Sequence, residues 1–278
     1  MSVTISASDV NKLRQITGAG MMDCKKALTE TGGDFDAAID YLRKKGQKVS
    51  EKRADRETNE GVVISAVSAD ASFGTIFGLG CETDFVAKNE DYVNFAKAIS
   101  AIAMANTPAT REELLALPID GISIAEKIAE QVGKIGEKIE ITDYALIRGE
   151  QVVSYNHSNG KVGVLVALNK KGEAIEAAGR DITMQIAAMS PIAIDKNDVP
   201  EEVKTREMEI GREQARAEGK PENILDKIAI GKLEAYYKDA TLLNQKFVKD
   251  NSKTIRDVLA GVEKDLTVSA FKRVALGA

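Results

Sequence analysis

The hexapeptide Cys81-Glu82-Thr83-Asp84-Phe85-Val86 joins two segments of different character. Residues 74–80 before it have the composition of a strand, and the residues after it show the apolar spacing of a helix. The hexapeptide contains neither glycine nor proline, and it places a carboxylate beside an aromatic ring. Two interpretations follow. Either Thr83 or Asp84 caps the next helix and Phe85 packs into the core as a staple, or the loop presents Asp84 and Phe85 together to a partner.

The overall composition limits the classes of function that the chain can have. Its 278 residues suffice for two or more domains, and its 44% hydrophobic and 29% charged residues are ordinary for a soluble globular protein. A net charge of -5 and only 5% aromatic residues disfavour a surface that stacks bases or attracts phosphates. We therefore expect no direct contact with nucleic acid.

The chain has few side chains that could bind a metal or form a disulfide. Cys24, Cys81 and His157 are its only cysteines and its only histidine. They cannot build a disulfide framework or a four-ligand zinc site, so we expect no metal site and a reducing, cytoplasmic location. The N-terminus lacks the features of a secretory signal, and no apolar run approaches the roughly 20 residues of a membrane helix. We therefore expect no membrane association.

Residues 1–54 predict a small module of three short helices and a linker. In the first helix Val10, Leu13 and Ile16 fall on one side, and glycine-containing turns separate the three helices. The charged stretch 44–60 is interpreted as the end of the third helix or a solvated linker.

Two adjacent methionines open the second predicted helix. Met21 and Met22 cannot both face one core, because neighbouring residues of a helix point about 100° apart. We expect Met22 on the inner face of this helix and one residue of the pair at the surface, where methionine suits a contact with a partner.

The core repeats one order of elements. Residues 62–103 predict a β-hairpin followed by a helix, and residues 150–189 predict the same order again. In the second copy the link between strand and helix is the plain tetrapeptide Asn169–Gly172. The architecture therefore does not require an aromatic residue such as Phe85 in this link.

The repeated order suggests a division of the core into two subdomains. The first comprises residues 55–140, and the second comprises residues 141–190 together with 241–278. Residues 191–240 predict two charged antiparallel helices that turn at Gly219-Lys220-Pro221 and project from the core. Their apolar stripe is weak, so dimerisation through this hairpin stays open.

No set of catalytic residues assembles in the sequence. His157 lies in a segment typical of a hairpin turn, and Cys24 lies beside Lys25 in a helix where a structural role is favoured. The chain also contains no glycine-rich phosphate-binding pattern. The sequence therefore predicts a protein that binds a partner, not an enzyme, and we expect no cofactor.

Three motifs resemble signatures of the bacterial elongation factor Ts family. The segment Thr17–Leu28, which reads TGAGMMDCKKAL, resembles the N-terminal signature, and Thr83–Val86, which reads TDFV, resembles the core signature. His157 with Val162–Val166, which reads VGVLV, resembles a third block. The motifs occur in the family's order, and the resemblance covers nearly the whole chain.

The resemblance implies a fold and a function. The fold is α+β, with a three-helix module similar to a ubiquitin-associated domain, a core of two related subdomains, and a protruding helical hairpin that dimerises in some members. The function is that of a guanine nucleotide exchange factor, which binds the GTPase elongation factor Tu, promotes GDP release and supports translation elongation. Such a factor works without covalent chemistry, by binding the nucleotide-free GTPase more tightly than the loaded one.

The resemblance also implies which residues contact the partner. Phe85 would act as a wedge, and Asp84 would disturb the water network around the magnesium ion that the partner holds with GDP or GTP. The residues with implied contacts are Thr83, Asp84, Phe85 and Val86 in the core, Arg14, Met21, Met22 and Lys25 in the N-terminal module, and His157 in the second subdomain.

The sequence departs from the family pattern at its C-terminal end, and two other classes of function were also considered. Many members continue past the last core strand with a further helix that touches the partner, whereas this sequence stops at Ala278, so we expect that contact to be absent or replaced. The other classes are an adaptor similar to a ubiquitin-associated domain without exchange activity, and an RNA-binding translation protein that uses the charged residues 44–56.

Overall fold

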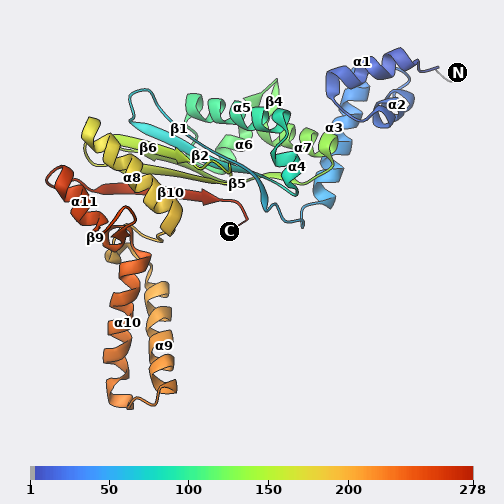
Figure 1. Cartoon of the computed structure of the whole chain (residues 1–278). Helices are drawn as coiled ribbons and strands as arrows, with labels where there is room; N and C mark the ends of the chain where they lie inside the picture. Colours follow the sequence, from blue (N-terminus) through green and yellow to red (C-terminus); the bar gives the residue numbers. More distant parts are fainter. Residues whose placement is uncertain (1–3, 278) are drawn as a thin grey trace.

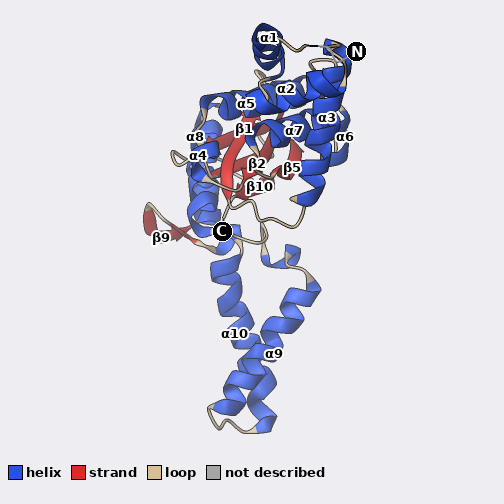
Figure 2. Cartoon of the chain, turned by 90° about the vertical axis from the view of Figure 1, so that its right-hand side faces the viewer, coloured by secondary structure: helices blue, strands red, loops and turns tan. Residues whose placement is uncertain are grey.

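The computed structural model describes residues 4–277, which form three parts in an elongated arrangement (Figure 1). The N-terminal helices lie at one end, two sheets with their covering helices form the middle, and a helical hairpin projects from the other end (Figures 1 and 2). Within the described range, no helix combines the length and the hydrophobicity needed to cross a bilayer. The chain is thus a mixed α and β protein with a helical N-terminal region.

Three helices form the N-terminal module, as the sequence predicts. Ser6 caps the first by accepting the Asp9 N–H, and Asp34 caps the third by accepting the Ala37 N–H. Gly18 ends the first helix in the left-handed conformation that favours glycine. The small core between them contains Val10, Leu13, Cys24, Ala27, Leu28 and Ala38. The helices are α1 (Ala7–Thr17), α2 (Met21–Glu30) and α3 (Phe35–Lys52).

Helix α3 attaches this module directly to the core. It includes residues 44–52 of the charged stretch 44–60. For these residues the interpretation as the end of the third helix is confirmed, and the interpretation as a linker is wrong. The reason is that Gly46 and Val49 turn toward the core, where α3 crosses α7 (Ile124–Ile135). A Cβ atom on Gly46 would lie 2.7 Å from the Ala129 carbonyl oxygen. The absence of that Cβ atom lets the two helix backbones touch.

Two antiparallel three-stranded sheets pack face to face in the middle of the molecule. Their strand orders are β1-β2-β5 and β10-β7-β6. Side chains from both sheets, including Val63, Ile76 and Leu165, form one buried cluster between them. The strands are β1 (Glu60–Val67), β2 (Phe73–Cys81), β5 (Ile139–Arg148), β6 (Gln151–Asn156), β7 (Val162–Leu168) and β10 (Val268–Ala275).

Helices cover the outer face of each sheet and give four layers (Figure 1). On the first sheet these are α5 (Glu90–Asn106), α6 (Arg111–Ala116) and α7, and on the second they are α8 (Glu173–Met189) and α11 (Ile255–Val262). The short elements are α4 (Asp84–Ala87), β3 (Pro118–Ile119), β4 (Ile122–Ser123), β8 (Lys246–Phe247), β9 (Asp250–Thr254) and the 3-10 helices η1 (Lys196–Asp198), η2 (Glu222–Ile224) and η3 (Leu242–Asn244).

Both sheets are built in the same way. Each begins with a hairpin (β1-β2 or β6-β7), continues through a helix (α5 or α8), and adds a third strand beside the second strand of the hairpin (β5 or β10). Strand β5 pairs with β2 from Ile139 to Arg148. The first sheet therefore extends to Arg148, and the expected subdomain boundary between residues 140 and 141 falls inside β5.

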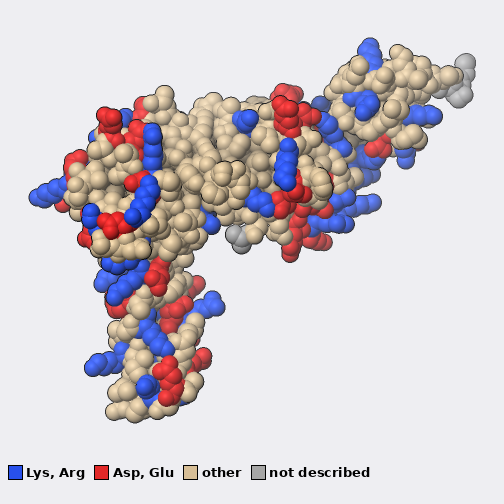
Figure 3. Space-filling model, viewed as in Figure 1, with Lys and Arg blue, Asp and Glu red and all other residues tan. Residues whose placement is uncertain are grey.

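The projecting hairpin consists of α9 (Glu201–Ala217) and α10 (Leu225–Ala240). Gly211 lies against Ala229 and allows close packing of the two helices, while Arg212 pairs with Asp226 at 2.7 Å. A small apolar cluster around Tyr237 is confined to its base. Side chains of both charge signs are mixed over the hairpin and the core (Figure 3).

Candidate partner-binding site

Phe85 lies on α4, between the end of β2 and the start of α5, and its ring faces solvent. The residue is 84% exposed, the highest value among the exposed large apolar side chains of residues 4–277. Val86 and Ala87 pack against the core beside it, and successive helical residues point about 100° apart, so burying these two turns Phe85 outward. The expectation that Phe85 staples the helix to the core is therefore wrong.

Thr83 fixes the start of α4, as the capping interpretation predicts. Its hydroxyl accepts the Val86 N–H at 3.5 Å and donates to the Glu137 carboxylate at 2.6 Å. The Thr83 N–H donates to the other oxygen of Glu137 at 3.0 Å. The Cys81 thiol donates to the Thr83 carbonyl, and burial raises the pKa of this thiol to about 11, which keeps it protonated at neutral pH. The backbone beneath Phe85 is thus fixed on both sides.

Asp84 carries a negative charge next to the exposed ring. The Lys88 ammonium donates to its carboxylate at 2.6 Å. This hydrogen bond lowers the pKa of Asp84 and raises the pKa of Lys88, so both groups are charged at neutral pH. Both side chains are at least partly exposed, so the carboxylate remains accessible to a partner.

The turn between β6 and β7 lies at the same edge of the core as α4. Glu60, which pairs with Cys81 in the first sheet, accepts a hydrogen bond from Lys161 of this turn at 2.5 Å. The Val63 N–H donates to the Gly160 carbonyl at 2.8 Å. Strand β1 therefore connects two motifs that lie about 75 residues apart in the sequence, TDFV and the segment around His157.

His157 is exposed in this turn. Its Nδ1 atom lies 2.7 Å from the Tyr155 hydroxyl, and the two rings are tilted with centroids 5.8 Å apart. Tyr155 thus orients an imidazole that stays accessible at the surface. Among residues 4–277, no group of three His, Cys, Asp or Glu side chains is placed to hold a metal ion.

The N-terminal module exposes the residues that the resemblance singled out. Arg14 and Lys25 are exposed, and so are both methionines, Met21 to 57% and Met22 to 74%. The placement of Met22 on the inner face is wrong, because Cys24, Ala27 and Leu28 fill the core side of α2. One further apolar residue of the module is exposed against expectation. Ile16, whose spacing suggests the core, is 58% exposed.

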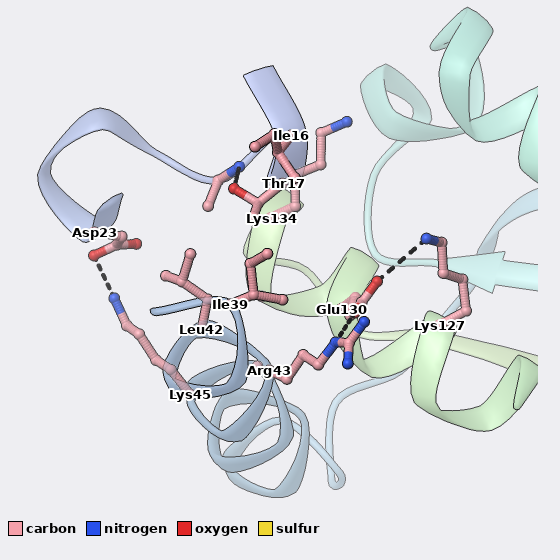
Figure 4. Close-up of a pocket in the computed structure, with 13 residues that line it drawn as sticks. Ile16, Thr17, Asp23, Ile39, Leu42, Arg43, Lys45, Lys127, Glu130 and Lys134 are labelled. Carbon is pink, nitrogen blue, oxygen red and sulfur yellow. Dashed lines mark hydrogen bonds and ion pairs between the residues drawn. The ribbon is translucent and has the colours of Figure 1, made fainter. Parts of the chain in front are cut away.

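A cavity of about 190 Å³ separates the module from the core at one place (Figure 4). Ile16, Ile39 and Leu42 line its module side, and helix α7 lines the other. Arg43 of α3 crosses to Glu130 of α7 at 2.7 Å, and Figure 4 shows Lys127 reaching the same carboxylate. The module is therefore held to α7 by an ion pair as well as by the glycine crossing.

Comparison with known proteins assigns the family. A family model described as elongation factor TS matches residues 82–278. The elongation factor Ts of Cytophaga hutchinsonii is 61% identical over 275 residues, which are 98% of this chain and 99% of the relative. Those of Amoebophilus asiaticus and Porphyromonas gingivalis are 52% and 49% identical over 99% and 100% of this chain and 100% of each relative. With matches of this extent, the chain belongs to the elongation factor Ts family of translation elongation factors.

Proposed function

We propose that this protein is a guanine nucleotide exchange factor that binds elongation factor Tu and promotes GDP release. It would act in the cytoplasm during translation elongation, without covalent chemistry and without a cofactor of its own. The N-terminal module would correspond to the family's ubiquitin-associated-like domain, and the two sheets with their helices to its two related subdomains.

The exposed ring of Phe85 is the observation that carries this proposal. Burying a phenylalanine side chain is worth about 1.5–3 kcal/mol, so leaving it in water gives up stability that the fold could have gained. The chain nevertheless fixes the backbone beneath the ring through Thr83 and packs the neighbouring Val86 inward. A rigid support with an unpartnered apolar tip suits insertion into a pocket of another protein.

The proposed mechanism follows from the charge beside the ring. GDP is held on the GTPase by its phosphates and a magnesium ion. Phe85 would displace partner side chains near the ion, and the ionised Asp84 would disturb its water network. Because the factor would bind the nucleotide-free form more tightly, its binding would weaken the hold on GDP by the same coupling free energy.

The other exposed residues would form separate contacts with the same partner. Arg14, Met21, Met22 and Lys25 would contact its nucleotide-binding domain, and His157 would contact a different domain. The RNA-binding alternative relies on the charged residues 44–56, where Arg53 and Arg56 are already engaged with Glu82. Homodimerisation through α9 and α10 remains a prediction, which sedimentation at high protein concentration would test.

Stopped-flow release of fluorescent GDP from purified elongation factor Tu tests the proposal. Phe85→Ala should slow stimulated release about thirtyfold, because an aromatic interface anchor is worth about 2 kcal/mol. Its thermal unfolding should not change, since the ring makes little contact with its own chain. Val262→Ala, which truncates another exposed apolar side chain on α11, is the matched control and should release GDP at the unmodified rate. Unchanged release by Phe85→Ala would contradict the proposal.

A further inference from the structure

Two carboxylates hold the link between β2 and α5 to the chain segment just before β5. Glu82 accepts the Lys138 N–H at 2.6 Å, and Glu137 accepts the Thr83 N–H at 3.0 Å. Each segment therefore supplies one carboxylate and receives one through its backbone. We call these four residues, Glu82, Thr83, Glu137 and Lys138, the reciprocal clamp.

The reciprocal clamp reaches the helix that carries Phe85. Glu137 also accepts the Thr83 hydroxyl proton at 2.6 Å, and that hydroxyl accepts the Val86 N–H of the first turn of α4. Glu137 thus fixes both polar groups of the cap. Phe85 is almost fully exposed, so the direction of its ring depends on this backbone and not on neighbours around the ring.

The reciprocal clamp also reaches the N-terminal module. Arg53, the C-cap residue directly after α3, donates to the Glu82 carboxylate at 2.7 Å, and the Glu82 side chain is only 15% exposed. Lys138 donates through its ammonium group to the carbonyls of Ala54 and Arg56, each at 2.9 Å. The helix that contributes to the module's core therefore ends on the residues that position α4.

The charges support this arrangement. Burial of the Glu82 carboxyl acts to raise its pKa, but hydrogen bonds from Lys138 and Arg53, together with the charges of Arg53 and Arg56, outweigh burial and leave the pKa of Glu82 below its ordinary value. Glu82 is therefore ionised at neutral pH, and hydrogen bonds to an ionised acceptor are the stronger kind.

We propose that Glu137 is a positioning residue for Phe85. We further propose that Glu82, through its ion pair with Arg53, holds the N-terminal module in a fixed orientation relative to α4. The reciprocal clamp would fix the position of Phe85 relative to Met21 and Met22 of the module. Both contact surfaces would then be in position before the partner binds. Binding would not have to pay the conformational entropy of ordering the link between β2 and α5. This inference rests on the proposed exchange function.

The direct test compares Glu137→Ala with a matched carboxylate on α7. Glu126 also accepts hydrogen bonds from the N–H and the hydroxyl of one capping residue, Ser123. It lies at the N-terminal end of α7, whereas Glu137 follows the C-terminal end. Glu126→Ala is therefore the control, and Glu137→Gln is the conservative variant that keeps one acceptor for Thr83. Two readouts apply to all three full-length proteins: amide hydrogen exchange of residues 82–88 in the isolated factor, and GDP release measured over a range of factor concentrations.

We expect Glu137→Ala to accelerate hydrogen exchange of the Thr83 and Val86 amides about tenfold, equivalent to about 1.4 kcal/mol. Its maximal rate of stimulated GDP release should fall several-fold, and Glu137→Gln should restore part of it. Glu126→Ala should leave both readouts unchanged. Arg53→Met should accelerate exchange of the same amides less, because Lys138 and Arg56 still bind Glu82.

Two results would overturn the inference. One is unchanged amide exchange at residues 82–88 in Glu137→Ala. The other is faster amide exchange with an unchanged maximal rate of GDP release, which would make the reciprocal clamp purely structural. If Glu137→Ala does not fold, Thr83→Val replaces it, because it removes both hydroxyl bonds and keeps the backbone N–H bond to Glu137. Exchange of the Val86 amide should then accelerate, and the maximal rate of GDP release should fall; no change in either would overturn the inference. Failure of the proposed function would instead appear as unchanged GDP release by Phe85→Ala, whatever the amide exchange shows.

Discussion

The link after β2 and the link after β7 occupy equivalent places in the two halves of the core, yet they differ in what they expose. Both are attached to the segment that precedes the third strand of their sheet. In the second half Asn169 makes this attachment with its side chain, which accepts the Thr267 N–H at 2.8 Å and donates to the Asp265 carbonyl at 2.9 Å. In the first half the carboxylates of Glu82 and Glu137 do so.

The difference lies in what is built on the attachment. The second link passes directly from Asn169 to α8, while the first adds α4 and an exposed aromatic ring. The core architecture therefore needs an attached link but does not need Phe85. A residue that the fold can do without, held on a rigid support, is best explained by a partner.

The largest effect tests whether the two halves are equivalent in packing. Ile99 on α5 and Ile182 on α8 are both fully buried against their sheets. Each substitution by alanine should lower the free energy of unfolding by about 2–5 kcal/mol, through lost burial and the cavity left behind. Urea denaturation measures both. If only one variant lost stability, the two halves would not contribute alike and the comparison would fail.

A smaller effect tests whether the second link only stabilises the fold or also contacts the partner. Asn169→Ala should cost about 1 kcal/mol of stability, because it removes hydrogen bonds at a partly solvated site. The GDP release that it stimulates should equal that of the unmodified protein. Thermal unfolding and stopped-flow release on the same samples give both values. Loss of exchange activity in this variant, at a temperature where it is folded, would show that the second link also serves the partner.

Acid should loosen the first link through Glu82. The pKa of Glu82 lies below the value of about 4.3 for glutamate in an unfolded chain. Ionised Glu82 therefore stabilises the fold above that pH, and this contribution is lost as the pH falls through the lowered pKa. The NMR shift of the Lys138 amide should titrate with Glu82, at a pH below the ordinary pKa of a glutamate carboxyl. In Glu82→Gln protein this titration should disappear; its persistence would assign it to another group.

The smallest effect concerns the ion pair on α4. Asp84 and Lys88 are exposed, so their pairing is screened by water and salt. Lys88→Ala should leave thermal unfolding unchanged at both low and high salt. A clear loss of stability at low salt would show that this pair, and not the reciprocal clamp, holds α4 in place.

Periodicity in the sequence was enough to predict the repeated order of hairpin and helix, the three N-terminal helices and the projecting pair. It could not place the end of the first sheet, because the length of β5 depends on its hydrogen bonds to β2, which are distant in the sequence. It also left open whether residues 44–52 continue the third helix or form a linker. The helix there crosses α7, with Gly46 against Gly133 and Val49 against the core, and these contacts carry no local signal in the sequence.

The candidate site was predictable in identity but not in geometry. The local pattern around Phe85 fits a staple as well as a wedge, and only the inward packing of Val86 and the exposure of the ring exclude the staple. The motifs supplied Thr83 and Asp84, but Glu137 lies 54 residues from Thr83 and carries no local signal of their contact. Met22 was misplaced because its neighbours Cys24 and Leu28 already fill the core side.

The continuity of α3 has a consequence for how the protein would be degraded. Its 18 residues span about 27 Å without interruption. Beyond Lys52, the carbonyls of Ala54 and Arg56 are bound by Lys138, and the Thr58 hydroxyl is bound by Glu140. Proteases cut relaxed chain, which is commonly found between a small module and its core. Here α3 itself crosses the junction, and the exposed residues 54–57 that follow it are tied to the core by Lys138. Brief digestion should therefore release the N-terminal module only slowly.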